Sequence, residues 1–437
     1  MKQTGPTRQP IFYGWWVIAI AFVTMGVAIT ARSSFSLLYP EILAEFGWSR
    51  NVTAGAFSLG FLISTAMLPI IGVLMDRSGP RLIIPLGALL VILGYGLVTL
   101  IDSPWAFYAT MGLLVINGSM AMSYIVHSMF LPAWFVRNRG LAVGIAFSGV
   151  GVGGYILMPV IQTIIDDHGW RTACLAMAGL IAVAIIPLNA LFQRSSPQEM
   201  GLEPDGGPAP RRDNRPAPDP IVDRAWTEID WTLGRAARTA RFWWIAVGFF
   251  SALFAWYAIQ AHQTQFLIEE GFSSLVAAEA LGLVALFGIA GQIVTGWLSD
   301  RLGREIAWSL AMLGFAACYL ILVVMQGAPS GTLLYTMIAF QGLLGYGLAV
   351  LFGAVMTEIF SGRHIARIVA VLSLSGNVGA AAGVWFLGAV HDASGSYLIG
   401  FWVCFGFALF SILCVWFAAP RKVRLVAGQA ARRQAKA

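Results

Sequence analysis

The sequence predicts an all-α membrane protein with twelve transmembrane helices arranged as two six-helix bundles. Three observations carry this prediction: 58% of the 437 residues are hydrophobic, only 11% are charged, and long apolar runs recur along the chain. A soluble domain carries about a quarter charged residues, and about 20 apolar residues suffice to cross the hydrocarbon core. Inside lipid such runs must be helical, because each backbone polar group has to find its partner within the segment.

The apolar runs divide the chain into two sets of six. We expect spans near residues 14–38, 53–75, 82–101, 106–130, 140–164, 172–193, 242–267, 276–298, 306–326, 332–358, 367–390 and 397–419. Residues 1–193 then form the N-terminal bundle and 242–420 the C-terminal bundle. A linker covers 194–241, and a basic tail covers 421–437. The stretch 195–220 is rich in Pro, Gly and charge, so it is expected to be flexible.

The basic residues predict the orientation in the membrane. With the N-terminus inside, only Arg50 and Arg171 of the 27 Lys and Arg residues fall outside, and only Arg32 falls in the interior of a span, since Arg367 is the first residue of span eleven at its cytoplasmic end. This asymmetry follows the positive-inside rule and places both termini in the cytoplasm, in a bacterial-type inner membrane. The net charge of +6 therefore reflects membrane topology and does not indicate a nucleic-acid partner.

Nothing in the sequence predicts an enzyme, a metal site or a cofactor. Cys174, Cys318, Cys404 and Cys414 lie in predicted spans without metal-ligand spacing, so we interpret them as small buried hydrophobic residues. The glycine-rich run at 149–154 lies in mid-span and lacks the Lys-Ser/Thr pair of a phosphate-binding loop.

The two halves repeat each other. The stretch "GVLMDRSGPR" (72–81) recurs as "GWLSDRLGRE" (296–305), so that Asp76 corresponds to Asp300. The pair Asn117-Gly118 recurs as Gln341-Gly342 at the same offset. Six spans repeated in this way are typical of a two-bundle transporter, whose site lies between the bundles near the midplane.

These paired loops resemble those of the major facilitator superfamily. The run "WFVRNRGLAVGIAFSG" (134–149) resembles the span-five fingerprint of the monocarboxylate transporters and their oxalate/formate relatives, and "RSSFSLLYPEI" and "HDASGSY" fit the same group. The group's other fingerprint, before span one, is only partly present as "FYGWW" (12–16). The resemblance implies the major facilitator fold. It also implies a carrier for small organic monocarboxylates that works by alternating access, and we expect proton symport and a monomer in the lipid bilayer.

The resemblance also implies a gating role for the two repeated loops. Each loop can form a charge network in one conformation and lose it in the other. The alternative is that its arginines only anchor the loop under the positive-inside rule. The gating residues would be Gly72, Asp76, Arg77, Gly79 and Arg81 in the first copy and Gly296, Asp300, Arg301, Gly303 and Arg304 in the second.

Arg32 is the principal candidate for binding substrate. A central Arg costs about 2.5–3.5 kcal/mol on insertion scales, so it needs a cavity, a counter-charge or a nearby interface. Its side chain could extend to the outer headgroups, or it could face the cavity and bind a carboxylate. In the family that the chain resembles, a basic residue of span one handles substrate at or next to this position. The second arginine of that family, in span eight, corresponds here to Gln292. The loss of this charge favours a monoanion over a dianion, or equally a larger and less acidic metabolite.

Other polar residues in the spans are weaker candidates for the cavity wall, because each could equally be a packing residue. Asn117 and Tyr124 share one face of span four. The remaining substrate-binding candidates are His262, Gln265, Gln341, Tyr346 and Asn377. Candidates for carrying a proton are His127, His262 and Glu358, since symport needs a group that titrates near neutral pH. The alternatives are an anion exchanger, an efflux carrier for drugs or neutral metabolites, and a transporter-like sensor that signals through the linker.

Overall fold

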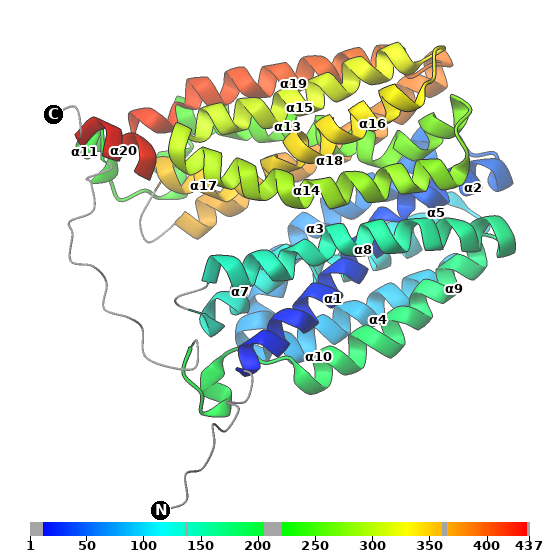
Figure 1. The fold of residues 1–437 in the computed structure, drawn as a ribbon, viewed down its shortest axis with the longest axis horizontal. Coiled ribbons are helices and arrows are strands. Elements are labelled where there is room, and N and C mark those ends of the chain that lie inside the picture. Colours follow the sequence, from blue (N-terminus) through cyan, green and yellow to red (C-terminus); the bar gives the residue numbers. More distant parts are fainter. Residues whose placement is uncertain (1–11, 136–138, 205–220, 361–364, 435–437) are drawn as a thin grey trace, which may run out of the picture.

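The computed structural model describes residues 12–135, 139–204, 221–360 and 365–434. Within these ranges twelve segments are long and apolar enough to cross a membrane, which confirms the predicted all-α fold. They lie in two groups of six, the N-terminal half below and the C-terminal half above in Figure 1. Each group surrounds its own hydrophobic core, and the functional cavity lies between them.

Several spans of the N-terminal bundle are interrupted. Its elements are α1 (Tyr13–Ser33), α2 (Phe35–Phe46), α3 (Arg50–Ser78), α4 (Pro80–Val98), α5 (Pro104–Phe107), η1 (Tyr108–Ile116), α6 (Asn117–Met120), α7 (Tyr124–Trp134), α8 (Arg139–His168), α9 (Trp170–Leu180), η2 (Ile181–Ile185) and α10 (Ile186–Phe192). The first span therefore comprises α1 and α2, and the fourth runs from α5 to α7.

The C-terminal bundle repeats this arrangement. Its elements are α13 (Ala240–Glu269), α14 (Ser274–Leu302), α15 (Arg304–Met325), α16 (Gly331–Ala339), η5 (Phe340–Leu344), η6 (Gly345–Val350), α17 (Leu351–Ile359), α18 (Ile365–Ser394) and α19 (Leu398–Ala418). Spans four and ten both leave regular α-helical geometry, at η1 and at η5 with η6. Such interruptions often mark functional segments, and here the chain that follows each one reaches the cavity.

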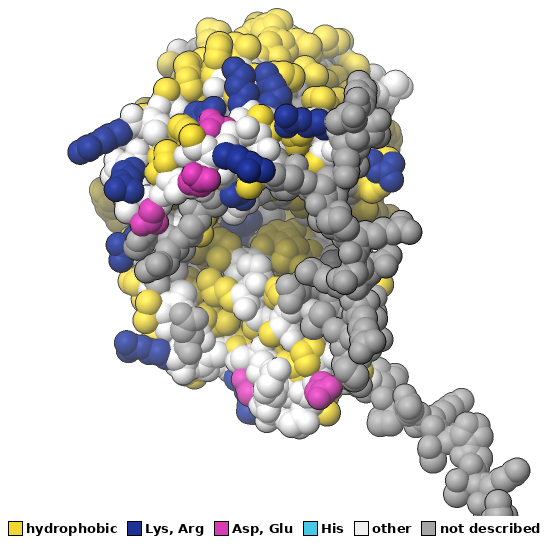
Figure 2. All heavy atoms as spheres, turned by 90° about the vertical axis from the view of Figure 1, so that its left-hand side faces the viewer, with side chains coloured by type: hydrophobic (Ala, Val, Ile, Leu, Met, Phe, Trp, Pro, Cys, Tyr) yellow, Lys and Arg dark blue, Asp and Glu magenta, His cyan; other side chains and the backbone are white. Residues whose placement is uncertain are grey.

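The two ends of the molecule differ in charge. The loops after α3 and α14, the end of α10, the start of α13 and the end of α19 all lie at one end, which we call the basic end. Figure 2 views this end and shows Lys and Arg side chains around a hollow between the bundles. The other end, which we call the opposite end, holds the connections α2–α3, α8–α9, α13–α14 and α18–α19.

Glycine allows the helices to approach closely at matching places in the two halves. A Cβ on Gly149 of α8 would lie 2.1 Å from the Phe22 carbonyl oxygen of α1. A Cβ on Gly379 of α18 would lie 2.1 Å from the Phe250 carbonyl oxygen of α13. Small residues at such crossings let backbones meet in a membrane protein, so spans one and five pack in the same manner as spans seven and eleven.

Part of the predicted linker is packed and not loose. Beyond η3 (Pro197–Met200), the described part resumes at residue 221 and includes α11 (Arg224–Thr227) and α12 (Leu233–Ala236). The Trp226 indole donates a hydrogen bond to the Ile359 carbonyl over 2.8 Å, and Trp231 packs on Phe360 with ring centroids 5.1 Å apart. Apolar side chains therefore attach this part of the linker to the C-terminal bundle.

The tail also folds back onto the C-terminal bundle. After η7 (Pro420–Lys422), α20 (Ala427–Gln434) lies against the end of α14, where the Gln429 amide donates to the Leu302 carbonyl over 2.6 Å. The Arg421 backbone N–H donates to the Glu305 carboxylate over 2.9 Å. Polar contacts with the ends of α14 and α15 therefore attach this basic tail to the bundle.

The contact between α1 and α8 provides a stability test. We expect Gly149→Ala to lower the unfolding free energy by about 1–3 kcal/mol, because overpacking forces a backbone shift. Thermal unfolding of the detergent-solubilised protein measures the loss. The matched control is Gly144→Ala on the same helix, where a Cβ meets nothing within 4 Å. Equal melting temperatures for the two variants would contradict the close packing.

Candidate functional site

A central cavity of ≈ 260 Å³ lies between the two bundles. Its wall combines elements of both halves, since α1, α3 and α7 contribute from one side and α13, α14, α17 and α18 from the other. Residues near the middle of several spans therefore meet here although they are far apart in sequence. The lining residues are Ile29, Arg32, Ser33, Phe57, Phe61, Met120, Ser123, Tyr124, Ile125, Val150, Leu253, Trp256, Tyr257, Gln260, Gln292, Tyr346, Ala349, Phe352 and Asn377.

Arg32 supplies the charge of this cavity. It occupies the last turn of α1, next to the break between α1 and α2, and its half-buried side chain lines the cavity. The guanidinium carbon lies 6.0 Å from the ring centroids of both Phe61 and Tyr257. Among the described residues no carboxylate lies within ion-pairing distance of it. Arg32 thus faces the space between the bundles, where an anion can reach it, and not the outer headgroups.

Two predicted residues flank Arg32 from opposite bundles. Tyr124 at the start of α7 and Gln292 of α14 both line the cavity. Gln292 is neutral, so the cavity lacks a second fixed positive charge among its lining residues. The site can neutralise one carboxylate by charge and can offer amide and hydroxyl groups beside it.

Tyr346 and Asn377 also line the cavity, but protein groups already engage their polar atoms. The Tyr346 hydroxyl donates to Gln260 Oε1 over 2.7 Å. The Asn377 amide donates to Thr65 Oγ1 of the other bundle over 2.9 Å. Both residues therefore shape the cavity wall in this conformation, with fewer donors free for a ligand than their side chains could offer.

The structure places three other candidates away from the cavity lining. Asn117 is bonded within its own bundle, donating to the Gly112 carbonyl and accepting from Ser64, each over 3.0 Å. Gln341 is fully buried in η5, and neither atom of its amide has a partner among the described residues. Gln265 donates to Glu269 over 2.7 Å at the opposite end.

The three proton-carrier candidates also lie off the cavity lining. His127 is buried in the N-terminal bundle, with Nδ1 3.0 Å from the Ser123 carbonyl oxygen. His262 is buried between the Val384 carbonyl, at 2.9 Å, and the Tyr397 hydroxyl, at 3.3 Å. Glu358 accepts from Arg304 over 2.7 Å at the basic end. The structure does not bring these groups together with Arg32.

The cavity also has an aromatic wall, which was not predicted from the sequence. Phe57 and Phe61 lie one turn apart on α3, and Trp256 and Tyr257 line the cavity from α13. On α13 the spacing of 253, 256, 257 and 260 marks one helical face. That pattern was readable in the sequence, but in a span rich in Phe, Trp and Tyr it does not distinguish a cavity wall from a lipid-facing or core face.

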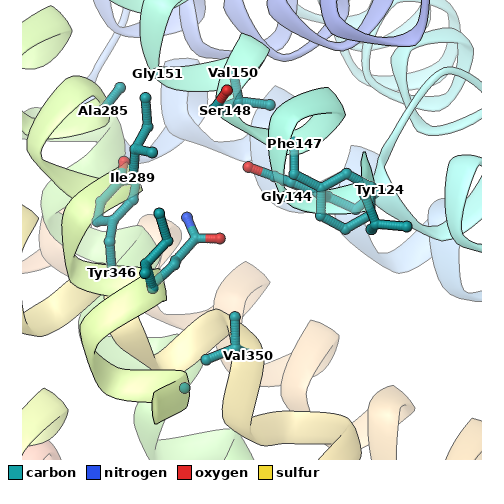
Figure 3. A pocket seen from close by; sticks show the side chains of 14 residues that line it. Tyr124, Gly144, Phe147, Ser148, Val150, Gly151, Ala285, Ile289, Tyr346 and Val350 are labelled. Atoms are coloured by element: carbon teal, nitrogen blue, oxygen red, sulfur yellow. The ribbon is translucent and has the colours of Figure 1, made fainter. Parts of the chain in front are cut away.

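A second pocket of ≈ 340 Å³ joins the cavity to the basic end. We call it the mouth pocket; it lies between the basic-end halves of α8 and α14 and shares Tyr124, Val150, Gln292 and Tyr346 with the central cavity. Figure 3 shows Tyr124 and Phe147 on one side, facing Ile289 and Tyr346 across the pocket. Together with the hollow in Figure 2, this pocket connects the central cavity to the basic end.

Polar contacts between the bundles close the opposite end. The Asp392 carboxylate of α18 accepts from the backbone N–H groups of Arg50 and Asn51, over 2.9 and 2.8 Å. These N–H groups begin α3, so a carboxylate from one bundle caps a helix N-terminus of the other. The Arg50 guanidinium also pairs with Glu269 and donates to the Tyr397 hydroxyl over 2.7 Å.

Two further contacts extend this closure. Ser274 of α14 donates to Asp166 of α8 over 2.9 Å. Ser36 of α2 and Thr264 of α13 share a hydrogen bond of 2.8 Å. In the described part of the structure, these contacts close the opposite end, while the mouth pocket leaves the central cavity accessible from the basic end.

The repeated loops at the basic end differ in their contacts. In the second copy Arg304 pairs with Asp300 over 2.8 Å and with Glu358 over 2.7 Å, all within the C-terminal bundle. Arg301 packs over Trp297, 4.0 Å from its ring centroid. In both copies glycine makes the turn, with φ of +67° at Gly79 and +118° at Gly303, conformations that suit residues without a Cβ.

Among the described side chains of the first loop, the polar contacts lie within the N-terminal bundle. Its Arg81 donates to the Ala190 carbonyl over 2.9 Å, and Arg77 is exposed. The Asp76 side chain lies outside the described part of the structure, as do the side chains that follow Phe135 up to Gly140. Gly72 and Gly296 lie two turns before the turn glycines Gly79 and Gly303, and a Cβ at Gly72 would meet nothing within 4 Å. The gating role of the ten loop residues therefore stays a prediction.

No cluster of His, Cys, Asp or Glu suited to a metal ion occurs among the described residues. All four cysteines are buried and free.

The contact between the Asp392 carboxylate and the N-terminus of α3 can be tested as the interaction that keeps the opposite end closed. Asp392→Asn removes the charge from two hydrogen bonds, each of a class worth about 1.5–3 kcal/mol, so we expect at least a tenfold shift toward states open at the opposite end. Distances between spin labels on cysteines introduced at Ala44 and Leu398 report this opening. Asp102→Asn, an exposed carboxylate at the same end, is the control. Identical distance distributions for wild type and Asp392→Asn would show that the cap does not hold this end closed.

Comparison with known proteins agrees with this architecture. A family model described as the Major Facilitator Superfamily matches residues 20–352. Monocarboxylate transporter 13 of Rattus norvegicus is 25% identical over 400 residues, which cover 91% of this chain and 87% of that protein. The oxalate:formate antiporter of Oxalobacter formigenes is 25% identical over 365 residues, which cover 84% of this chain and 82% of that protein.

Solved transporter structures share the fold. An inward-facing, occupied bacterial homologue of the human lysosomal transporter Spinster aligns with a TM-score of 0.67 at 17% identity, covering 97% of this chain and 98% of that chain. The nucleoside transporter NupG aligns with a TM-score of 0.68 at 11% identity, covering 93% and 100%. The chain is a membrane transporter, not an enzyme, and is related to the monocarboxylate transporters and the oxalate:formate antiporter. Because the family model spans most of the chain and the fold is shared end to end, the chain belongs to the Major Facilitator Superfamily.

Proposed function

We propose that this transporter carries organic monocarboxylates, and that Arg32 binds the carboxylate. The observation that carries this proposal is a guanidinium in the wall of a cavity between two apolar bundles, with no carboxylate paired to it among the described residues. Burying a cation without a partner is costly, and Arg presents a planar fork that matches a carboxylate. A monoanion supplies the missing charge, whereas a dianion would bring a second charge that Gln292 cannot neutralise.

The proposal includes alternating access with the basic end in the cytoplasm. Support comes from the positive-inside rule, because the basic end carries the Lys and Arg side chains seen in Figure 2. In this orientation the mouth pocket connects the site with the cytoplasm, and the Asp392–Arg50 contacts close the outside. Rocking of the bundles about the central site would close the basic end and open the opposite end. We place the carrier in a bacterial-type inner membrane.

Proton symport is our first expectation for coupling. A monoanion moving with one proton is electroneutral, so the membrane potential of about 2.3 kcal/mol per charge per 100 mV does not oppose its uptake. His262 and Glu358 would then act from outside the cavity, by affecting the contacts at the two ends of the molecule. His262 is bonded to Tyr397 at the opposite end, and Glu358 is bonded to Arg304 at the basic end.

Anion exchange is a second candidate, favoured by one specific observation. Among the residues that line the central cavity there is no Asp, Glu or His beside Arg32. An exchanger needs no titrating group at the site, since its cation is always occupied by one anion or the other when the bundles reorient. The similarity to an oxalate:formate antiporter supports the same possibility.

Removal of the Arg32 charge is the first test. In proteoliposomes preloaded with a monocarboxylate, we expect Arg32→Gln to reduce uptake of the same labelled acid by about 10- to 150-fold, since hydrogen bonds to charged groups are worth about 1.5–3 kcal/mol. Protein-free liposomes set the leak of the neutral acid. Arg235→Gln, in the linker and away from the cavity, is the matched control. Equal uptake by wild type and Arg32→Gln would refute the role of Arg32.

Coupling is tested with the same proteoliposomes and an internal pH dye. Symport predicts acidification above the protein-free baseline when an acid gradient is imposed on liposomes that contain no internal acid. Exchange predicts uptake only when an acid is present inside, without that acidification. Carboxylate-independent transport of a neutral solute would instead favour the alternative of an efflux carrier.

A further inference from the structure

The central cavity is larger than a small acid needs. Its ≈ 260 Å³ corresponds to about nine water molecules at about 30 Å³ each. Ligand sites of small molecules bury most of the ligand surface against their walls. A two- or three-carbon acid bound to Arg32 would leave much of this space to water. The volume therefore favours a ligand whose carboxylate carries a larger substituent, which we call the body of the ligand.

The polar groups of the wall leave little for a hydroxylated body to bind. Tyr346 is bonded to Gln260, and Asn377 is bonded to Thr65. Apart from Arg32, the cavity offers a ligand the hydroxyls of Ser33 and Tyr257 and the polar ends of Tyr124 and Gln292, and the rest of its lining is mostly apolar or aromatic. A sugar acid would therefore lose hydrogen bonds to water without replacing most of them, which costs free energy. The body of the ligand should be apolar.

Aromatic rings surround the charge. Phe61 and Tyr257 pack edge to face, with centroids 4.4 Å apart, and each lies 6.0 Å from the Arg32 guanidinium carbon. Phe57 extends this group, 5.2 Å from Phe61. Trp256, whose ring lies 6.1 Å from that of Tyr257, contacts Tyr346 at 4.9 Å. Aromatic pairs gain stability beyond their buried area, so a planar ring bound beside Arg32 finds partners on both bundles.

We propose that the substrate is an aryl monocarboxylate, whose carboxylate binds Arg32 and whose ring packs against Phe61 and Tyr257. The inference rests on the proposed function and narrows it from monocarboxylates in general to those that carry an aromatic ring close to the acid. The carboxylate and the ring are recognised by different groups, so the two parts of the proposal can be tested separately.

A ligand panel tests the ring and the charge independently. Binding of acetate, pyruvate, gluconate, cyclohexylacetate, phenylacetate and 2-phenylethanol is measured by isothermal titration on the full chain in nanodiscs. We expect phenylacetate to bind at least tenfold more tightly than acetate, pyruvate and gluconate, and about two- to tenfold more tightly than cyclohexylacetate, from the value of an aromatic pair. Protein-free nanodiscs correct for partition of the aryl ligands into lipid, and the Arg32→Gln variant tests whether binding depends on the charge.

A variant of the wall tests the location of the ring. We expect Tyr257→Leu to lose about two- to tenfold more affinity for phenylacetate than for acetate, while Tyr257→Phe retains the affinity for both acids. Tyr335→Leu, at a tyrosine that is 60% exposed on the bundle surface, is the matched control. The wild-type panel keeps the inference falsifiable if Tyr257→Leu does not fold.

The outcomes separate the two proposals. Small acids or gluconate binding as tightly as phenylacetate in an Arg32-dependent manner would overturn the aryl inference and leave the carboxylate carrier standing. Tight binding of 2-phenylethanol, or phenylacetate binding that ignores Arg32→Gln, would overturn the proposed function and the aryl inference together. Absence of Arg32-dependent binding by phenylacetate would likewise overturn the aryl inference.

Discussion

An unpaired positive charge in an apolar setting is the constraint on which the rest of the structure depends. A charged Arg near the centre of a membrane helix costs about 2.5–3.5 kcal/mol on insertion scales, and the described part of the structure offers Arg32 no carboxylate. The chain meets this cost by leaving a cavity between its bundles, so that water or an anion can solvate the guanidinium. The flanking Phe61 and Tyr257 rings also attract the cation through their π faces.

The two ends of the molecule are built from different kinds of contact, and the difference permits a conformational change. At the opposite end, charged and polar groups join the bundles directly, with Asp392 capping α3 and Arg50 linking Glu269 and Tyr397. At the basic end, the ion pairs of Arg304 stay within one bundle. Such polar contacts can break and reform against water at modest cost. Within each bundle, by contrast, glycine contacts hold the helices at backbone distance, so each bundle can move as one body.

Duplication explains the framework but not the site. Both halves share the glycine packing of spans one with five and seven with eleven, the interrupted fourth and tenth spans, and the glycine turns at Gly79 and Gly303. The cavity is asymmetric, since Arg32 comes from the N-terminal half, while Gln292 and the Gln260–Tyr346 pair come from the C-terminal half. A repeated framework with an asymmetric lining lets one ligand be bound by different chemistry on its two sides.

The sequence by itself determined the membrane setting, the twelve helices, the two-bundle repeat and Arg32 as the principal candidate, because hydropathy and charge act locally along the chain and lipid tolerates few alternatives. It also determined that Tyr124 and Gln292 deserved consideration, and both line the cavity. Only the tertiary structure decided which deep polar residues face the cavity and which are satisfied elsewhere. Asn117 bonds Ser64, and His262 bonds Tyr397 and Val384, contacts between distant spans that helical periodicity does not encode. The aromatic wall and the Asp392 cap likewise arise where helices from different bundles meet, so they depend on packing angles that no single span specifies.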